Sequence, residues 1–74
     1  MKVVYKTVEE HLYREDIGAY ASYGIEAVCG EKRVAYVSDI SPDIRLTTHL
    51  SFLCNALELD PIHLLDVAED AIAE

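Results

Sequence analysis

The chain has 74 residues, with six Lys and Arg against fourteen Asp and Glu, and its formal net charge is −8. A chain of this length forms a single domain, here residues 1–74, and buries only about 60% of the surface that its unfolded form exposes. The negative charge repels phosphate backbones and anionic membrane surfaces, so direct binding to nucleic acid or to a membrane is not expected.

The beginning of the chain predicts neither a targeting signal nor a membrane span. Glu9 and Glu10 interrupt it before an apolar run of signal-peptide length can form. No segment has the roughly 18 apolar residues that cross a bilayer. We therefore expect a cytoplasmic protein in which Cys29 and Cys54 stay reduced and act as small apolar residues.

Residues 2–13 predict a first strand, since Val, Tyr and Thr are interleaved there with polar residues. The two faces of this strand are both mixed, which suits an edge strand or a bulged strand. One face would carry Val4, Lys6, Val8, Glu10 and Leu12, and the other Val3, Tyr5 and Thr7.

The charged segment Arg14–Gly18 predicts a turn, because its glycine accepts a positive φ without steric cost. A second strand follows over residues 19–29, and a short connection leads to a third over residues 33–39. Connections this short join antiparallel neighbours, since parallel strands need a crossover of about a dozen residues. In the second strand the odd positions are assigned to the core: Ala19, Ala21, Tyr23, Ile25, Ala27 and Cys29.

Two helices are predicted after the strands. Ser41-Pro42-Asp43 predicts the first start, with a serine cap, a proline in the first turn and an aspartate at the positive end of the dipole. Asp60-Pro61 repeats this pattern and starts a helix that runs toward the carboxyl end. The apolar stripe of the first helix is Leu46, Leu50, Leu53 and Leu57, and that of the second is Leu64, Leu65, Val67, Ala68, Ala71 and Ile72.

Together these elements predict an α+β fold. A three-stranded antiparallel β-meander is followed by two α-helices that pack on one face of the sheet, in two layers. A core of this size supplies only about 3–5 kcal/mol without a disulfide, a metal or a partner chain, which favours self-association as a homodimer.

The sequence shows no pattern of a known catalytic class. It has no Gly-rich phosphate loop, no G-x-S-x-G and no H-E-x-x-H. His49 and Cys54 lie five positions apart, which puts them about 140° apart around a helix and makes them a poor nucleophile pair. We therefore expect a protein without catalytic residues and without a cofactor.

One alternative is a small metal-binding protein or enzyme. His63, Asp66 and Asp70 recur at i, i+3 and i+7 on one side of the second predicted helix, where they could face a shared cation. Carboxylate-rich helices show this spacing by chance, so a solvated helix face is the favoured interpretation.

The preferred function rests on charge, because residues 58–74 hold six acidic side chains and no Lys or Arg. Acidic residues near a helix carboxyl end add to the negative end of the dipole, and a basic partner would offset them. We predict a non-catalytic interaction or regulatory module whose acidic helical face, with Asp66, Asp70 and Glu74, binds a basic protein surface. Solubility alone is the competing explanation, and an acidic mimic of nucleic acid is a further alternative.

Phe52 projects away from the predicted leucine stripe and is the only phenylalanine in the chain. If it is exposed, it would anchor a partner or a second copy of the chain, since aromatic residues are enriched at the centres of contacts. If it is buried, it would fill the seam between the two helices.

The run from Cys54 to Asp70 resembles a family of short bacterial proteins of unknown function. Members of this family, from Gram-positive, clostridia-like bacteria, often end in a Leu-x-Pro-x-His-Leu-x-Asp-Val-x-Glu-Asp pattern. The resemblance implies a bacterial cytoplasmic origin and draws attention to His63, Asp66 and Asp70, but it implies no activity. The matching positions are Leu59, Pro61, His63, Leu64, Asp66, Val67, Glu69 and Asp70.

Overall fold

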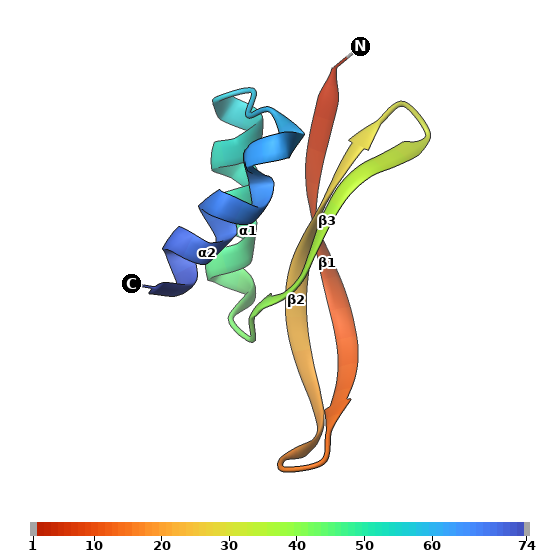
Figure 1. Cartoon of the computed structure of the whole chain (residues 1–74), viewed down its shortest axis with the longest axis vertical. Helices are drawn as coiled ribbons and strands as arrows, with labels where there is room; N and C mark the ends of the chain where they lie inside the picture. The colour runs from red at the N-terminus through yellow and green to blue at the C-terminus, as the bar shows by residue number, and fades with distance from the viewer. Residues whose placement is uncertain (1, 74) are drawn as a thin grey trace.

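A computed structural model describes residues 2–73, and its elements follow the predicted order (Figure 1). Three antiparallel strands form one sheet in the order β1-β2-β3, and two helices follow them, so the predicted α+β fold is confirmed. The elements are β1 (Val3–Arg14), β2 (Gly18–Cys29), β3 (Lys32–Ser41), α1 (Ile44–Ala56), the 3-10 helix η1 (Pro61–His63) and α2 (Leu64–Ala73).

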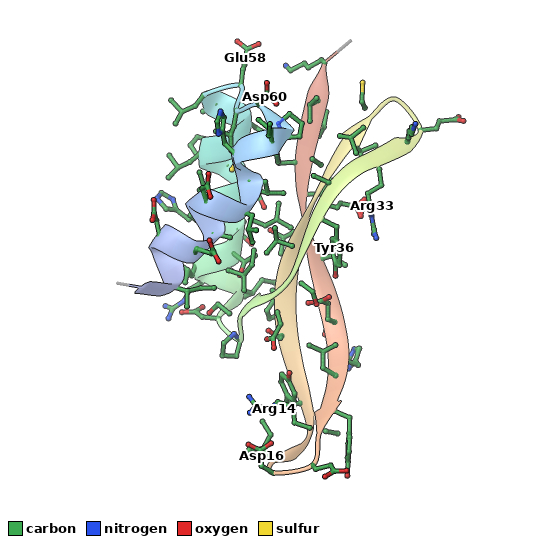
Figure 2. All side chains as sticks on the ribbon, viewed as in Figure 1. Arg14, Asp16, Arg33, Tyr36, Glu58 and Asp60 are labelled. Atoms are coloured by element: carbon green, nitrogen blue, oxygen red, sulfur yellow. The ribbon has the colours of Figure 1, made fainter. Side chains whose placement is uncertain are left out.

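The predicted turn between the first two strands is confirmed. The amide of Ile17 donates to the carbonyl oxygen of Arg14 at 3.3 Å, and Gly18 follows with a φ of +79°. A left-handed residue directly after such a turn is the usual geometry of a three-residue hairpin loop. Arg14 and Asp16 form an ion pair of 3.2 Å at this tip (Figure 2).

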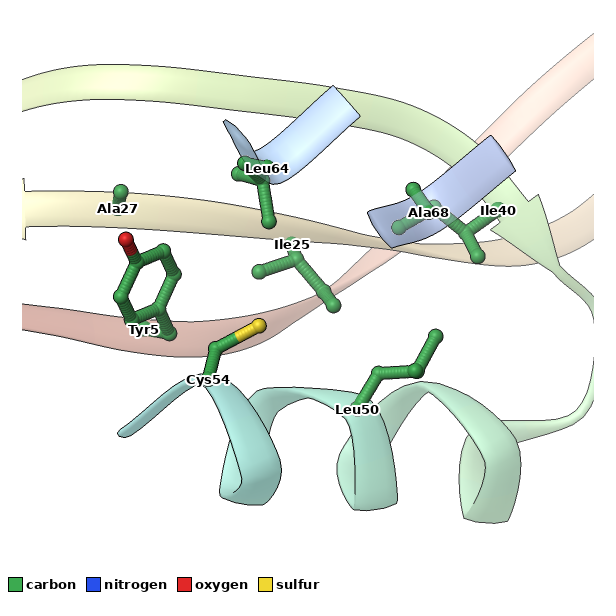
Figure 3. Close-up of a cluster of buried hydrophobic side chains, with 8 residues drawn as sticks. All are labelled: Tyr5, Ile25, Ala27, Ile40, Leu50, Cys54, Leu64 and Ala68. Atoms are coloured by element: carbon green, nitrogen blue, oxygen red, sulfur yellow. The ribbon is translucent and has the colours of Figure 1, made fainter. Parts of the chain in front are cut away.

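Both helices cover the same face of the sheet, with α1 over β1 and α2 over β3. The core lies between these layers, where side chains of both helices meet those of the strands (Figure 3). Its buried residues are Tyr5, Ile25, Ala27, Ile40, Leu50, Cys54, Leu64 and Ala68. Cys29 and Cys54 are both free; Cys54 is buried, whereas Cys29, which the alternation of β2 assigned to the core, is only half-buried.

The predicted leucine stripe of α1 is wrong for three of its four members. Only Leu50 is buried, while Leu57 is 75% exposed. Leu46 and Leu53 also lie outside the core. The residues of α1 that are buried are Thr47, Leu50, Ser51 and Cys54.

Hydrogen bonds to β1 explain why α1 turns a different side toward the sheet than the leucine spacing predicts. The Asn55 side chain accepts from the backbone amide of Tyr5 at 2.8 Å and donates to its carbonyl oxygen at 2.9 Å. Ser51 and Thr7 share a hydrogen bond of 2.9 Å between their hydroxyl groups, and the Tyr5 hydroxyl donates to the carbonyl oxygen of Leu59. Since unpaired backbone groups are costly to bury, these bonds turn the polar side of α1 toward the sheet.

The starts of the helices refine the predictions. Asp43, rather than Ser41, caps α1, because its carboxylate accepts from the amide of Arg45 at 2.9 Å. Asp60 caps η1 as predicted, and η1 leads directly into α2. In α2 the apolar arc is narrower than predicted, since Leu65 and Ile72 are more than half exposed.

The β1–β2 hairpin extends beyond the helix layer, as Figure 1 shows at its lower end. Ala19 and Ala21, which were assigned to the core, are therefore exposed, whereas Ile25 and Ala27 of the same strand face are buried. No helix among the described residues has the length and apolar character needed to cross a membrane.

Candidate functional site

The predicted interaction residues lie at the surface of the helix layer. Phe52 on α1 is 65% exposed, which favours the first of its two interpretations. His63 at the end of η1, and Asp66 and Asp70 on α2, are exposed as well. By helical spacing Asp66 and Asp70 share one side of α2, whereas His63 belongs to η1 and Phe52 to α1. Glu74 lies outside the described residues.

The carboxylates of this layer have no ion-pair partner within residues 2–73. The basic side chains that form ion pairs there are Arg14, Arg33 and Arg45, and their partners all lie in the strands, the turns or the cap of α1. Figure 2 shows the side chains of Glu58 and Asp60 at the end of the helix layer where α1 passes into η1. The five acidic residues of the layer are Glu58, Asp60, Asp66, Glu69 and Asp70.

Large apolar side chains lie among these carboxylates. Leu65 and Ile72 of α2 are more than half exposed, and Ile62 of η1 is 76% exposed. Positions i, i+4 and i+7 of one helix row are occupied by Leu65, Glu69 and Ile72. This row therefore carries an acidic side chain between two apolar ones. We call the exposed residues Ile62, Leu65, Asp66, Glu69, Asp70 and Ile72 the α2 face.

A second polar group lies on the opposite side of the sheet and was missed by the sequence analysis. The carboxylate of Glu10 accepts from the Tyr36 hydroxyl, from the Ser38 hydroxyl at 2.7 Å and from the backbone amide of Asp39 at 2.7 Å. Burial raises the pKa of Glu10, but these hydrogen bonds outweigh it and hold the pKa below its usual value.

Asp39 extends this group toward β2. Its carboxylate accepts from the Ser22 hydroxyl at 2.6 Å and from the Tyr20 hydroxyl at 2.9 Å, and these bonds lower its pKa. Figure 2 shows Arg33 and Tyr36 on the side of the sheet away from the helices, where the guanidinium lies 4.3 Å from the centre of the tyrosine ring.

The hydrogen bonds of this polar group hold an irregular segment of β3 in place. Ile25 pairs with Val37 and Tyr23 with Ser41, so two extra residues of β3 lie opposite Gly24. Glu10 reaches across β2 at this point and accepts from the amide of Asp39, whose φ is +54°. The carboxylates of Glu10 and Asp39 thus accept hydrogen bonds from donors of their own chain. Their role is therefore structural. Gly24 was the one sequence signal for this irregularity, because a glycine inside a strand often marks a bulge or a close approach of another backbone.

An open hollow of about 630 Å³ lies between the start of β1 and the connection from α1 to η1. Lys2 and Val3 form one wall, and Asn55, Glu58, Leu59 and Asp60 contribute to the other. The Asn55 amide is bonded to the backbone of Tyr5, and Asp60 caps η1, so these two polar side chains already serve the fold.

The metal alternative finds no preformed site in the described part of the chain. No group of three or more His, Cys, Asp or Glu side chains within it is arranged to hold a metal ion, which applies to His63, Asp66 and Asp70 as well. Burial raises the pKa of the Cys54 thiol, which disfavours its reactive thiolate form.

Comparison with known proteins gives one match. A family model described as a family of unknown function (DUF6514) matches residues 1–74, which is the whole chain. Neither a curated protein nor a solved structure matches the sequence. The chain therefore belongs to DUF6514, a family of unknown function.

Proposed function

We propose that the chain is a non-catalytic protein-interaction module whose α2 face docks on a basic protein surface. The observation that carries this proposal is the combination on α2 of exposed apolar side chains with carboxylates that have no cation partner among the described residues. Exposed apolar groups rimmed by polar residues are typical of protein-binding surfaces. A partner that fits would carry apolar anchors interspersed with Lys or Arg.

The two kinds of side chain would contribute differently. Full burial of an Ile or Leu side chain stabilises a contact by about 1.5–3 kcal/mol, so Leu65 and Ile72 would supply most of the affinity. An exposed ion pair contributes only about 0.2–1 kcal/mol. The carboxylates of Asp66, Glu69 and Asp70 would therefore act mainly on the rate of association and on the choice of partner.

A synthetic probe tests this proposal. The probe is a fluorescein-labelled 18-residue peptide with Leu at i, i+3, i+4 and i+7 and with Lys on its other face, and its binding is measured by fluorescence anisotropy. The variant D66N/E69Q/D70N removes three negative charges from the α2 face. We expect it to bind the probe about tenfold more weakly, because three exposed charge contacts sum to about 1.4 kcal/mol.

The matched control removes the same number of charges elsewhere. E15Q/D16N/E31Q alters only exposed positions in the two hairpin turns, so it changes the net charge equally. The proposal predicts that this control binds the probe as the parent protein does. Equal weakening in both triple variants would show that only net charge matters and would overturn the proposal, as would no weakening in the α2 variant.

The proposal also includes the location of the protein, its origin and the nucleic-acid mimic. A cytoplasmic location and an origin in Gram-positive, clostridia-like bacteria are parts of this proposal, and both would imply an intracellular partner. The nucleic-acid mimic is a special case of the same surface, since a DNA-binding protein is one class of basic partner. It predicts that free DNA displaces the chain from such a partner.

A further inference from the structure

The end of the β1–β2 hairpin forms an arm whose helix-side face, with His11, Tyr13, Ala19 and Ala21, is not covered by the described part of the chain. We define the arm as residues 9–14 of β1 and 18–22 of β2 with the turn between them. Tyr13 is 72% exposed and Ile17 in the turn is 59% exposed. The arm makes the molecule long, since its extents are 41 × 28 × 19 Å. Its radius of gyration is 12.5 Å, compared with about 11 Å for a compact chain of this length.

An uncovered two-stranded arm is an unusual element. An isolated hairpin of two strands is marginally stable in water, and a third strand or a packed layer is normally needed. Near Ile25, β3 and the helices provide this third strand and packed layer. The alternation of inward and outward residues in β2 continues through Ala21 and Ala19, but these two side chains are exposed. The arm thus has a strand pattern suited to a larger sheet than one chain supplies.

The free edge of β1 in the arm has bonding groups available. The bonds between Asn55 and the backbone of Tyr5 show that the amide and carbonyl of Tyr5 point away from β2. Because these directions alternate along an antiparallel strand, the backbone groups of Glu9, His11 and Tyr13 point the same way. Asn55 occupies only the position at Tyr5, so the edge beyond it is a template for a further strand.

The other edge of the arm is less accessible. Ser41 lies opposite Tyr23, and the chain then turns toward α1 on this side of β2 (Figure 1). The Tyr20 hydroxyl is also held by Asp39 of β3. An added strand would therefore meet the end of β3 after a short distance.

We infer that a second copy of the chain pairs with this edge, β1 against β1 and antiparallel, with His11 opposite its counterpart. This register places Glu9 opposite Tyr13 and Glu10 opposite Leu12 of the second copy. It also brings Lys6 toward the turn of the second copy, where Asp16 pairs with Arg14 of its own chain.

Charge selects this register among its neighbours. A shift by two residues in one direction places Glu10 opposite Glu10 and Lys6 opposite Arg14 of the second copy. The opposite shift places Glu10 opposite Arg14, which is favourable, but it also places Glu9 level with Glu15 in the turn. Like charges directly opposite each other destabilise a strand pair, so the register centred on His11 is the one without such a conflict.

Charge disfavours the helix layer more than the arm as the surface that joins two copies. The helix layer carries five carboxylates without ion-pair partners in residues 2–73, so two such layers repel each other. The arm carries four acidic side chains and Arg14, which already pairs with Asp16, so its net charge of about −3 is smaller than the −5 of the helix layer. The proposed contact therefore uses a different surface from the α2 face, and its test is independent of the proposed function.

Cysteine cross-linking tests the contact and its register. Cα atoms of a hydrogen-bonded antiparallel pair lie about 5.5 Å apart, which a disulfide can bridge. We expect His11→Cys, in a Cys29→Ser background, to form a disulfide-linked dimer under mild oxidation. Glu9→Cys and Tyr13→Cys are the controls, because each would lie roughly 14 Å from its own counterpart in this register. Cross-linking at Glu9 or Tyr13 but not at His11 would overturn the proposed register.

Proline substitution tests the use of the edge itself. Pro at His11 removes an outward amide and leaves the bonds between β1 and β2 in place, and Ala21→Pro does the same on the other edge. In sedimentation from about 10 μM to about 1 mM, a range that suits a small contact, we expect the parent chain and Ala21→Pro to dimerise. His11→Pro is expected to associate at least tenfold more weakly while its circular dichroism spectrum is unchanged. A parent chain that stays monomeric over this range, or equal weakening by both prolines, would overturn the proposal.

Discussion

Replacing Gly24 by alanine tests how the sheet accommodates Glu10. A Cβ atom at Gly24 would lie closer than 3.0 Å to the carbonyl oxygen of Val37, a distance that real Cβ atoms essentially never show. It would also lie 3.2 Å from Oε1 of Glu10 and 3.3 Å from Cα of Ser38. Because two of these neighbours are backbone atoms of β3, the strand itself has to move and the Glu10 carboxylate is displaced with it.

The expected cost combines two effects. Overpacking that forces a backbone shift costs about 1–3 kcal/mol. Weakening one hydrogen bond to a charged group adds about 1–2 kcal/mol. A total of about 2–4 kcal/mol is a large part of the stability of a domain this small, and it corresponds to a fall in Tm of about 10–25 °C.

Urea and thermal unfolding followed by circular dichroism measure this cost, and Gly18→Ala is the matched control. Gly18 has nothing within 4 Å of its virtual Cβ, but its φ of +79° disfavours alanine. The control should therefore lose only about 1–2 kcal/mol, from backbone conformation alone. If Gly24→Ala lost less stability than Gly18→Ala, the close approach of Glu10, β2 and β3 would be refuted.

Four further substitutions test the packing of α1 and the role of the Glu10 carboxylate. Asn55→Ala should lower the free energy of unfolding by about 1–3 kcal/mol in urea, because both bonds to the edge of β1 are lost; an unchanged midpoint would contradict this. Leu50→Ala should cost about 2–4 kcal/mol and Leu57→Ala less than about 0.5 kcal/mol, and equal losses would disprove the orientation of α1. The pKa of Glu10 is lower in the folded chain, so its contribution is complete above about pH 4.3 and is lost as the pH falls through the folded pKa. Glu10→Gln should flatten this acid-side loss in urea titrations between pH 2 and pH 6, and an unaltered pH profile would argue against the role of Glu10.

Local patterns were sufficient to predict the order of the elements. The Arg14–Gly18 turn and the Asp60-Pro61 helix start each depend on a few adjacent residues, whose preferences the structure follows. Antiparallel pairing followed from the short connections. These features are local, so a single sequence contains the information they need.

The rotation of α1 and the polar group around Glu10 could not be predicted in the same way. The leucine spacing gave a consistent apolar stripe, but the bonds of Asn55 and Ser51 to β1 join residues more than 40 positions apart. Glu10 likewise meets Asp39 only because Gly24 lets it pass over β2. Tertiary contacts of this kind override local pattern, and sequence spacing does not report them.

The exposed positions of the candidate site were easier to predict than their chemistry. Asp66 and Asp70 are exposed because charged residues are costly to bury, and this is visible from composition. The exposure of Leu65 and Ile72 was not predicted, since a helix arc of six apolar residues is wider than the contact with the sheet. The mixed apolar and acidic character of the α2 face therefore emerged only from the structure.

Amide chemical-shift mapping tests most directly whether α2 provides the surface for a basic partner. Isotope-labelled protein is titrated with the Leu and Lys peptide, and the shifts of individual backbone amides are followed. If the α2 face binds the peptide, the largest changes occur at residues 62–72, and the amides around Glu10 and Asp39 stay unchanged. Changes concentrated on the open side of the sheet or along the arm, with α2 unaffected, would contradict it.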